Sequence, residues 1–85
     1  MIEKTAAELA PCEEGVIVSL GGGPGAQCRL RALGLSEGQH VRNISRIAWG
    51  GPIILLVNRA QVAVGRGMAR KIVVHVKGDR IERND

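Results

Sequence analysis

Five short runs rich in β-branched and aliphatic residues predict strands, at residues 16–20, 41–48, 53–57, 61–64 and 72–76. The run 53–57 is apolar on both faces, which in so small a protein indicates the central strand of the sheet. In the run 41–48 the polar residues Asn43 and Ser45 fall on the apolar face, so we expect a bulge or an exposed strand there. Asn58 and Arg59 fit a tight turn and predict a hairpin between the third and fourth strands.

Short helices are predicted between these strands. Residues 5–8 have the spacing of a capping box, with Thr5 first and Glu8 last, and predict about one helical turn. Residues 26–33 predict a two-turn helix in which Leu30 and Leu33 share one face. Residues 68–71 fit a single turn.

Glycines and prolines separate the predicted elements. Gly34 fits the left-handed position just after a helix, from which Leu35 can pack back on the last turn. Residues 21–25 predict a loop, since glycine is costly to order and proline lacks an amide donor. The other residues that we expect to form turns and caps are Gly38, Gly50, Gly51, Pro52, Gly65 and Gly67.

The predicted fold class is mostly β. Five short strands, with helices too short to connect parallel strands, predict a small five-stranded antiparallel barrel or a sandwich. A chain of 85 residues supports one small core, and with Trp49 as its sole aromatic residue that core must be aliphatic. We expect a single domain over residues 1–76 and a charged, flexible tail over residues 77–85.

The formal charge is unevenly distributed along the chain. Residues 1–28 carry four Glu and one Lys, whereas residues 29–85 carry eleven basic and four acidic residues, and the whole chain has a net charge of +4. Such an excess can attract phosphates, anionic lipid or an acidic protein. The first residues lack the apolar run of a signal peptide, and the longest apolar run is too short to span a membrane, so we expect a cytoplasmic protein.

No motif predicts catalysis, a cofactor or a small-molecule substrate. Gly21, Gly23 and Ala26 fit a variant of the dinucleotide-binding fingerprint, but the chain is too short for the parallel sheet which that site needs. No Ser-His-Asp, Cys-His or paired-carboxylate arrangement emerges, so we expect a protein that is not an enzyme. The candidate metal ligands are Cys12, Cys28, His40 and His75, among which no pair has a zinc-ligand spacing.

Basic side chains also raise the question of nucleic-acid binding. The residues that could contact phosphates are Arg29, Arg31, Arg42, Arg46, Arg59, Arg66, Arg70 and Lys71. Proteins that bind single strands rely on aromatic side chains for base stacking, and this chain has one aromatic residue. We therefore do not expect a nucleic-acid partner, and weak, salt-sensitive binding stays as an alternative.

Three segments in series resemble one known family. Residues 29–38, the Gly50-Gly51-Pro52 turn before an apolar strand, and residues 62–74 together resemble the ferrous-iron transport protein A (FeoA) family. The resemblance covers about residues 5–76. It implies an SH3-like barrel with short helices. Family members often have Gly after the proline of the first segment, where this chain has Cys12, and a thiol there favours metal contact slightly.

The FeoA family implies a function by association. Its members are cytoplasmic, non-enzymatic accessories of the ferrous-iron permease FeoB, an inner-membrane protein with a cytosolic GTP-hydrolysing domain. The same SH3-like module resembles the C-terminal domain of iron-dependent repressors of the DtxR type, which implies, as an alternative, a stand-alone regulatory domain. The resemblance supplies no catalytic residues.

The resemblance also suggests where a partner could bind. We expect residues 26–35 and the adjacent loops to face the permease, so that the protein lies at the membrane through its partner. Since arginines cannot be buried unpaired, Arg29 and Arg31 are the better contact candidates. The full candidate set is Arg29, Leu30, Arg31, Leu33, Leu35 and Met68. Aliphatic strand edges could also pair between copies, so a homo-oligomer stays open.

Overall fold

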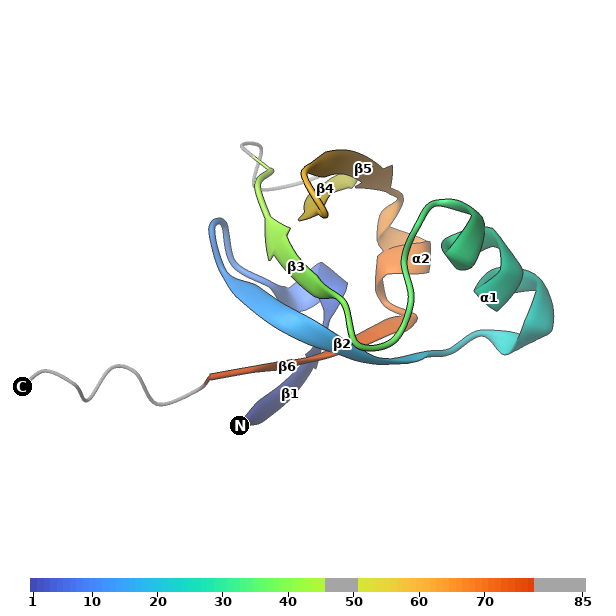
Figure 1. The fold of residues 1–85 in the computed structure, drawn as a ribbon, viewed down its shortest axis with the longest axis horizontal. Helices are drawn as coiled ribbons and strands as arrows, with labels where there is room; N and C mark the ends of the chain where they lie inside the picture. The colour runs from blue at the N-terminus through green and yellow to red at the C-terminus, as the bar shows by residue number, and fades with distance from the viewer. Residues whose placement is uncertain (46–50, 78–85) are drawn as a thin grey trace, which may run out of the picture.

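The structure is a computed structural model that describes residues 1–45 and 51–77. In chain order its elements are β1 (Ile2–Thr5), η1 (Ala6–Glu8), β2 (Glu14–Leu20), α1 (Gly23–Ala32), β3 (His40–Asn43), β4 (Ile53–Val57), β5 (Ala60–Val64), α2 (Arg66–Ala69) and β6 (Ile72–Val76), where η1 is a 3₁₀ helix (Figure 1). The mostly-β class with short helices is confirmed. The expected tail falls largely on residues 78–85, outside the described part of the chain.

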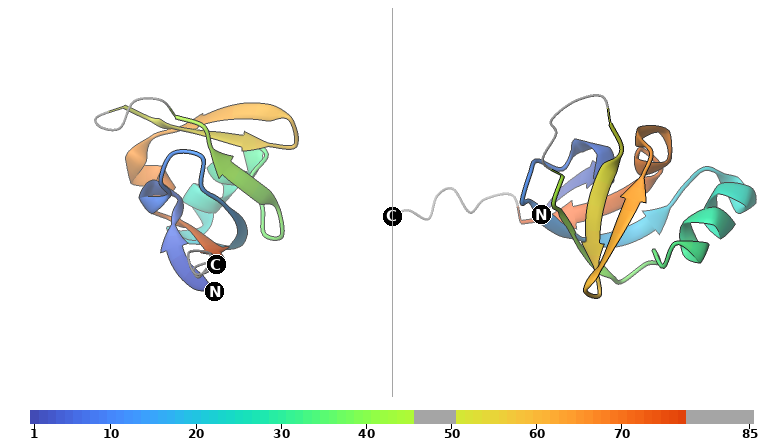
Figure 2. Two further views of the ribbon diagram at one scale, coloured as in Figure 1. Left: turned by 90° about the vertical axis from the view of Figure 1, so that its left-hand side faces the viewer. Right: turned by 90° about the horizontal axis from the view of Figure 1, so that it is seen from above.

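One antiparallel sheet contains every described strand, in the order β1-β6-β2-β3-β4-β5. The sheet curls strongly, so that β4 and β5 cross above β2 and β6 (Figures 1 and 2). The prediction of five strands was wrong by one, because β1 includes Glu3 and Lys4 and lacks an apolar run. The prediction of residues 53–57 as the central strand was also wrong, since β4 lies second from an edge.

The prediction of a bulge or an exposed strand in residues 41–48 was wrong for the described part of this run, because β3 is short and regular and its residues Val41 and Asn43 are buried. Regular pairing of β3 with β4 stops at Asn43, opposite Leu55. Beyond it, the Ser45 hydroxyl oxygen accepts a hydrogen bond of 2.7 Å from the Ile54 N–H, in place of a backbone partner. The bulge lies instead in β2, where the register against β6 shifts between Ile17 and Ser19. Residues 46–48 lie outside the described residues.

The core is aliphatic, as the composition requires. Alternate residues of β4 and β6 point inward and are buried, which is the pattern of strands with one covered face. The buried apolar residues of the described chain are Ala6, Leu9, Ile17, Leu20, Leu30, Leu35, Val41, Ile53, Leu55, Val57, Val64, Ala69, Ile72, Val74 and Val76. They lie on β2 to β6, on the three helices and, for Leu9 and Leu35, just after a helix, and they form one cluster; β1 contributes none of them.

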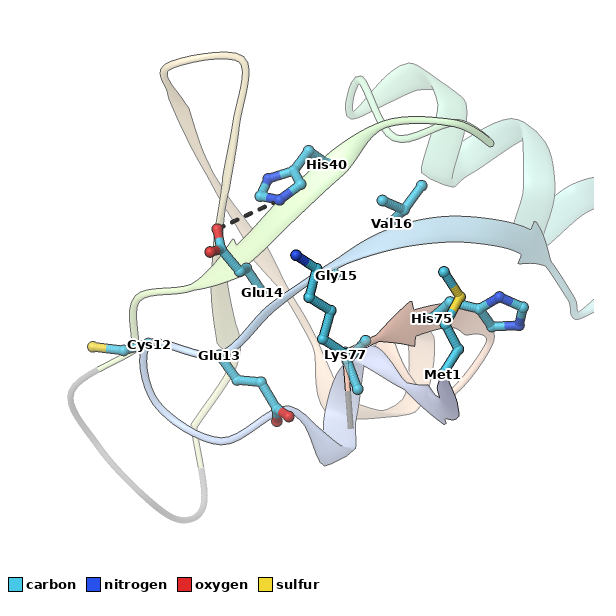
Figure 3. Close-up of a pocket in the computed structure, with 10 residues that line it drawn as sticks. Met1, Cys12, Glu13, Glu14, Gly15, Val16, His40, His75 and Lys77 are labelled. Atoms are coloured by element: carbon cyan, nitrogen blue, oxygen red, sulfur yellow. Dashed lines mark ion pairs between the residues drawn. The ribbon is translucent and has the colours of Figure 1, made fainter. Parts of the chain in front are cut away.

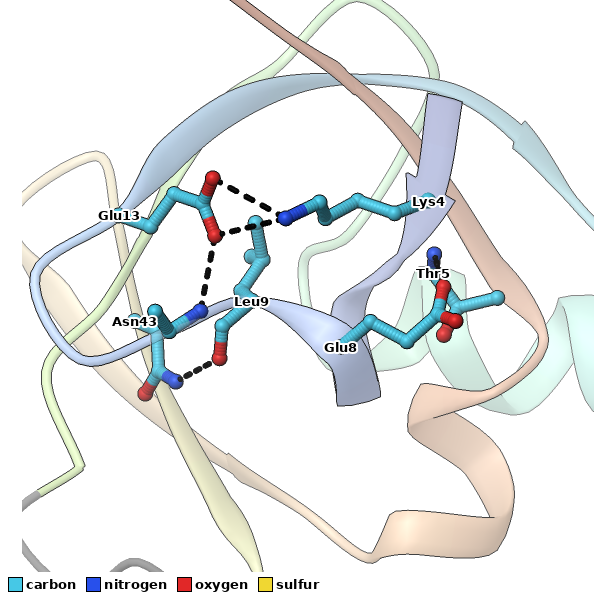
Figure 4. A network of polar contacts seen from close by, with 7 residues as sticks. Lys4, Thr5, Glu8, Leu9, Glu13 and Asn43 are labelled. Carbon is cyan, nitrogen blue, oxygen red and sulfur yellow. Dashed lines mark hydrogen bonds and ion pairs between the residues drawn. The ribbon is translucent and has the colours of Figure 1, made fainter. Parts of the chain in front are cut away.

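A polar network fixes the segment between η1 and β2 (Figure 4). The Lys4 ammonium lies 3.1 Å from Oε1 of Glu13, and the same oxygen accepts a hydrogen bond of 2.8 Å from the Ala10 N–H. Nearby, the Glu8 carboxylate accepts a hydrogen bond of 2.7 Å from the Thr5 N–H, as the capping-box spacing predicts. These contacts tie the edge strand β1 to the turn that starts β2.

Most of the predicted turns are confirmed. Asn58 and Arg59 both have positive φ, 50° and 70°, and form the two-residue turn between β4 and β5. Gly34 and Gly38 also have positive φ, 93° and 90°. Of the remaining turn candidates, Gly51 and Pro52 directly precede β4, Gly65 is the N-cap of α2, and Gly50 falls outside the described residues. The prediction of Gly67 as a turn or cap residue was wrong, because Gly67 lies inside α2.

Two helices differ in extent from the prediction. α1 begins at Gly23, so residues 23–25 belong to the helix and not to the predicted loop. Pro24 explains the difference, because the first turn of a helix has unpaired amides and proline's fixed φ suits it. α2 begins at Arg66, two residues before the predicted turn. In the described part of the chain, no helix is long and apolar enough to cross a membrane.

Candidate partner-contact surface

α1 extends from one end of the barrel and is held there by a few specific bonds (Figure 1). At its start, the Gly21 N–H donates a hydrogen bond of 2.7 Å to the Lys71 carbonyl oxygen. One turn into the helix, the Gln27 side-chain amide donates a hydrogen bond of 2.9 Å to the Leu20 carbonyl oxygen. α1 is thereby anchored to the last residue of β2 and to the residue that precedes β6.

The end of α1 is fixed by a Schellman motif. The Leu35 N–H donates to the Leu30 carbonyl oxygen at 3.1 Å, and the Gly34 N–H donates to the Arg31 carbonyl oxygen at 2.9 Å. Gly34 supplies the left-handed residue that this motif needs, with φ of 93°. Leu30 and Leu35 are both fully buried in the core, which is the apolar contact that accompanies such caps. The prediction of Gly34 as the helix stop is confirmed.

Most of α1 faces away from the core. Of the ten residues of α1, Leu30 alone is buried. The exposed residues of the last two turns and of the cap are Cys28, Arg29, Arg31, Ala32 and Leu33. Leu33 is 43% exposed, although large apolar side chains are more often buried. We call the group formed by Arg29, Arg31 and Leu33 the α1 surface.

Arg31 is held in place by Glu37 across the turn that follows the helix. Its two terminal nitrogens donate hydrogen bonds to the two carboxylate oxygens, at 3.0 and 3.3 Å. The side-chain hydrogen bonds from Arg31, with a smaller contribution from a backbone hydrogen bond, lower the pKa of Glu37 below its ordinary value. Among the described residues, Arg29 has no comparable ion pair. The α1 surface therefore presents one cation already paired and one open to a partner.

The structure separates the candidate contact residues into three groups. Arg29, Arg31 and Leu33 are exposed at the end of α1 and form the α1 surface. Arg29 and Leu33 are four residues apart and share one side of it, whereas Arg31 lies on the opposite side, paired with Glu37. Leu30 and Leu35 are 0% exposed and cannot touch a partner in this conformation, because they complete the core beneath the helix. Met68 lies on α2, half-buried against the core.

One contact of this surface could not be identified among the sequence candidates. Glu37 is not among the contact candidates that the sequence offers, yet its carboxylate positions Arg31. Opposite charges on the two sides of a helix-ending glycine could have predicted this pair. A Schellman turn reverses the chain direction and so brings such residues together.

The metal-ligand candidates do not converge. Cys12, His40 and His75 line one hollow of about 650 Å³, at the end of the sheet near the chain start, whereas Cys28 lies on α1. Figure 3 shows Cys12 and His75 at opposite ends of this hollow. Nε2 of His40 lies 3.4 Å from Oε1 of Glu14, and Nε2 of His75 lies 3.2 Å from Oε1 of Glu3. Within residues 1–45 and 51–77, no group of three or more His, Cys, Asp or Glu could hold a metal ion.

The basic side chains are spread over several elements. Arg42 lies on β3, Arg59 in the turn between β4 and β5, and Arg70 at the end of α2, and all three are exposed. Arg66 on α2 and Lys71 are half-buried, and Arg46 lies outside the described residues.

Solved structures of other proteins share this fold. A crystal structure of the iron uptake regulatory protein FeoA matches with a TM-score of 0.80 at 28% identity, over 88% of this chain and 97% of that one. FeoA of Stenotrophomonas maltophilia, an SH3 domain protein solved with zinc, matches with a TM-score of 0.70 at 26% identity, over 84% of this chain and 88% of that one. The SH3-like fold is thus confirmed.

A transcriptional repressor contains the same fold. A manganese-dependent repressor matches with a TM-score of 0.79 at 18% identity, over 88% of this chain and 42% of the repressor. At this identity the likeness concerns the fold alone.

Sequence comparison gives the family. The Methanocaldococcus jannaschii protein named "Putative Fe(2+) transport protein A" is 34% identical over 62 residues, which make up 73% of this chain and 73% of that protein. The model of the FeoA domain matches residues 4–76, nearly the whole of the sheet described above. This chain belongs to the FeoA domain family.

Proposed function

We propose that this chain is an accessory protein of ferrous-iron uptake, which binds the cytosolic part of a FeoB-type permease and modulates iron transport or GTP hydrolysis. Membership of the FeoA family supports the iron-uptake role. The names of its relatives point the same way, since one refers to Fe(2+) transport and another to iron uptake regulation. In this proposal the protein acts in the cytoplasm by binding and not by catalysis, and it reaches the inner membrane through its partner.

The α1 surface is the observation that carries the proposal. An isolated exposed leucine needs no explanation, but here Leu33 lies one helical turn after Arg29, at the end of a helix whose first turn and last turn hold no acidic residue. Arginine is among the residue types that dominate binding energy at protein interfaces, and an exposed apolar side chain beside it adds area that a partner can bury. A partner segment with an apolar side chain next to an acidic residue would fit Leu33 and Arg29.

The geometry of the helix also suits a contact role. Its cap bonds and the Arg31–Glu37 pair hold the surface in one arrangement before any partner arrives. A preorganised surface loses less conformational entropy on binding than a flexible one. The α1 surface can therefore bind without reshaping the barrel.

A pull-down with detergent-solubilised permease tests the proposal. The wild-type chain should retain the permease, in the presence or absence of a guanine nucleotide, and the Arg29→Glu variant should retain much less. Arg59→Glu is the matched control, because it changes the net charge equally at an exposed position away from α1. Absence of binding by the wild-type chain under both nucleotide conditions would contradict the proposed function.

A further inference from the structure

The two edges of the sheet differ in how they are protected. β1, at one edge, has the charged residues Glu3 and Lys4 among its four residues. β5, at the other edge, has the sequence Ala-Gln-Val-Ala-Val, without charge or proline. Natural proteins usually block exposed edges with charges, prolines or bulges, since a free edge can pair with another strand. β5 lacks these blocking features.

Two residues of β5 direct their backbone N–H and C=O groups away from β4, toward the outside of the sheet. The two-residue turn makes Val57 and Ala60 a hydrogen-bonded pair, and such pairs alternate along an antiparallel ladder. Gln61 and Ala63 therefore direct their N–H and C=O groups away from β4. The neighbouring ladder agrees, because Ile54, opposite Ala63, accepts a hydrogen bond of 2.9 Å from the Ile44 N–H on its other side.

This outer edge has no partner within the described part of the chain. No strand there pairs with β5 except β4, and no backbone group bonds to the outward groups of Gln61 or Ala63. Both side chains are exposed, whereas Val62 between them is half-buried against the core. Figure 2 shows β5 alongside β4 at the end of the sheet.

We propose that the β5 edge pairs with the same edge of a second copy of this chain, in an antiparallel dimer centred on Val62. In this register Gln61 lies opposite Ala63 of the partner subunit, and the reverse pair is equivalent by symmetry. Each of the two pairs exchanges both of its backbone hydrogen bonds, so the four outward groups of each edge are satisfied. Val62 faces Val62 of the partner subunit at the closely spaced, non-hydrogen-bonded position.

The charges along the edge permit this occupant. The chain has a net charge of +4, so two copies repel each other in general, yet the five residues that would pair carry no charge. In the proposed register, Arg59 lies opposite Gly65 of the partner subunit, and Arg66 lies opposite Asn58 of the partner subunit. Like charges therefore do not face each other across the new ladder, which would otherwise destabilise it.

The oligomeric state of the purified full chain tests the proposal. Analytical ultracentrifugation from micromolar to millimolar concentration should show a monomer that becomes a dimer. Amide hydrogen exchange over the same range should show protection of Gln61 and Ala63 that grows with concentration, because these amides are bonded only in the dimer. A monomer at every concentration, or concentration-dependent protection elsewhere but not at these amides, overturns the proposal.

Charge variants test the register. Gln61→Lys combined with Ala63→Lys places like charges opposite each other and should raise the dimer dissociation constant about tenfold or more. Gln61→Glu combined with Ala63→Lys places opposite charges together and should restore dimerisation. Ala10→Lys combined with Ala32→Lys is the control for added charge, since both alanines are exposed and lie outside β5. Equal dissociation constants for the first two variants overturn the register.

The same experiments distinguish self-pairing from a strand supplied by another protein. If the chain stays monomeric and the Gln61 and Ala63 amides become protected only on addition of the permease, self-pairing is overturned and the edge accepts a partner strand. The permease pull-down with the α1 variants is independent of this result, because neither Arg29 nor Leu33 lies on β5.

Discussion

The side-chain amide of Asn43 donates a hydrogen bond of 2.8 Å to the carbonyl oxygen of Leu9, thirty-four residues earlier in the chain. Asn43 is 3% exposed, and its own side-chain oxygen accepts a hydrogen bond of 2.9 Å from the Ser45 N–H. Its backbone N–H and C=O bond to Glu13 and Cys12. One buried polar residue thus links the end of β3 to the segment between η1 and β2.

Replacing Asn43 should therefore destabilise the fold. Asn43→Ala leaves the Leu9 carbonyl oxygen and the Ser45 N–H without partners, and we expect the free energy of unfolding to fall by about 1–3 kcal/mol. Urea denaturation followed by circular dichroism measures this change. The exposed Asn58 provides the control, since Asn58→Gly keeps a residue suited to positive φ and should change the free energy by less than about 0.5 kcal/mol. Equal effects of the two substitutions would contradict a structural role for Asn43.

Gly34 and Gly25 provide a test of backbone conformation alone. At both positions an added Cβ would meet nothing within 4 Å, but Gly34 has φ of 93° and Gly25 lies within α1. Gly34→Ala should lower the free energy of unfolding by about 1–2 kcal/mol. Gly25→Ala should raise it by about 0.5–1 kcal/mol, because alanine has the higher helix propensity. Equilibrium denaturation of both variants checks the opposite signs; a shared sign would rule out this explanation of the cap.

The pKa of Glu37 should depend on Arg31. In the folded chain, hydrogen bonding to Arg31 holds this pKa below its ordinary value of 4.5. The contact therefore stabilises the fold at pH values above the unfolded-state pKa, and this contribution is lost as the pH falls through the folded-state pKa. Arg31→Gln should raise the pKa of Glu37 toward the ordinary value, as measured by an NMR titration of its side-chain carboxyl. An unchanged titration curve in the variant would show that Arg31 does not cause the shift.

The basic surface should not confer nucleic-acid binding. Within residues 1–45 and 51–77, the exposed arginines lie on α1, β3, the β4–β5 turn and the end of α2, and the sequence has one aromatic residue for base stacking. A mobility-shift titration with duplex and single-stranded oligonucleotides at low salt should stay flat. Binding that weakens steeply as salt is added would instead favour the nucleic-acid alternative.

Local sequence patterns predicted most of the helices, strands and turns, because each of these depends mainly on a few consecutive residues. Gly34 followed by Leu35 predicted the helix cap, and Asn58-Arg59 predicted the hairpin turn, since both depend on a few consecutive residues. β1 could not be predicted, because its stability comes from pairing with β6 at the other end of the chain. The place of β4 in the sheet could not be predicted either, since strand order depends on contacts between distant segments.

The candidate surface was only partly predictable. The sequence placed Arg29, Leu30 and Leu33 on one short helix, but it could not determine which leucine enters the core. The Schellman turn decides this, because it brings Leu35 back onto Leu30 and leaves Leu33 at the exposed cap position. The role of Glu37 also depends on this turn.

A binding titration with the permease tests the central claim most directly. Isothermal titration calorimetry of the chain against the cytosolic region of the permease should give a measurable affinity for the wild type. Combining Arg29→Glu with Leu33→Asp should weaken that affinity by about tenfold or more, whereas Arg59→Glu should leave it nearly unchanged. Wild-type affinity in the α1 double variant, or no heat of binding with any chain, would contradict the proposal that α1 forms the contact surface of this protein.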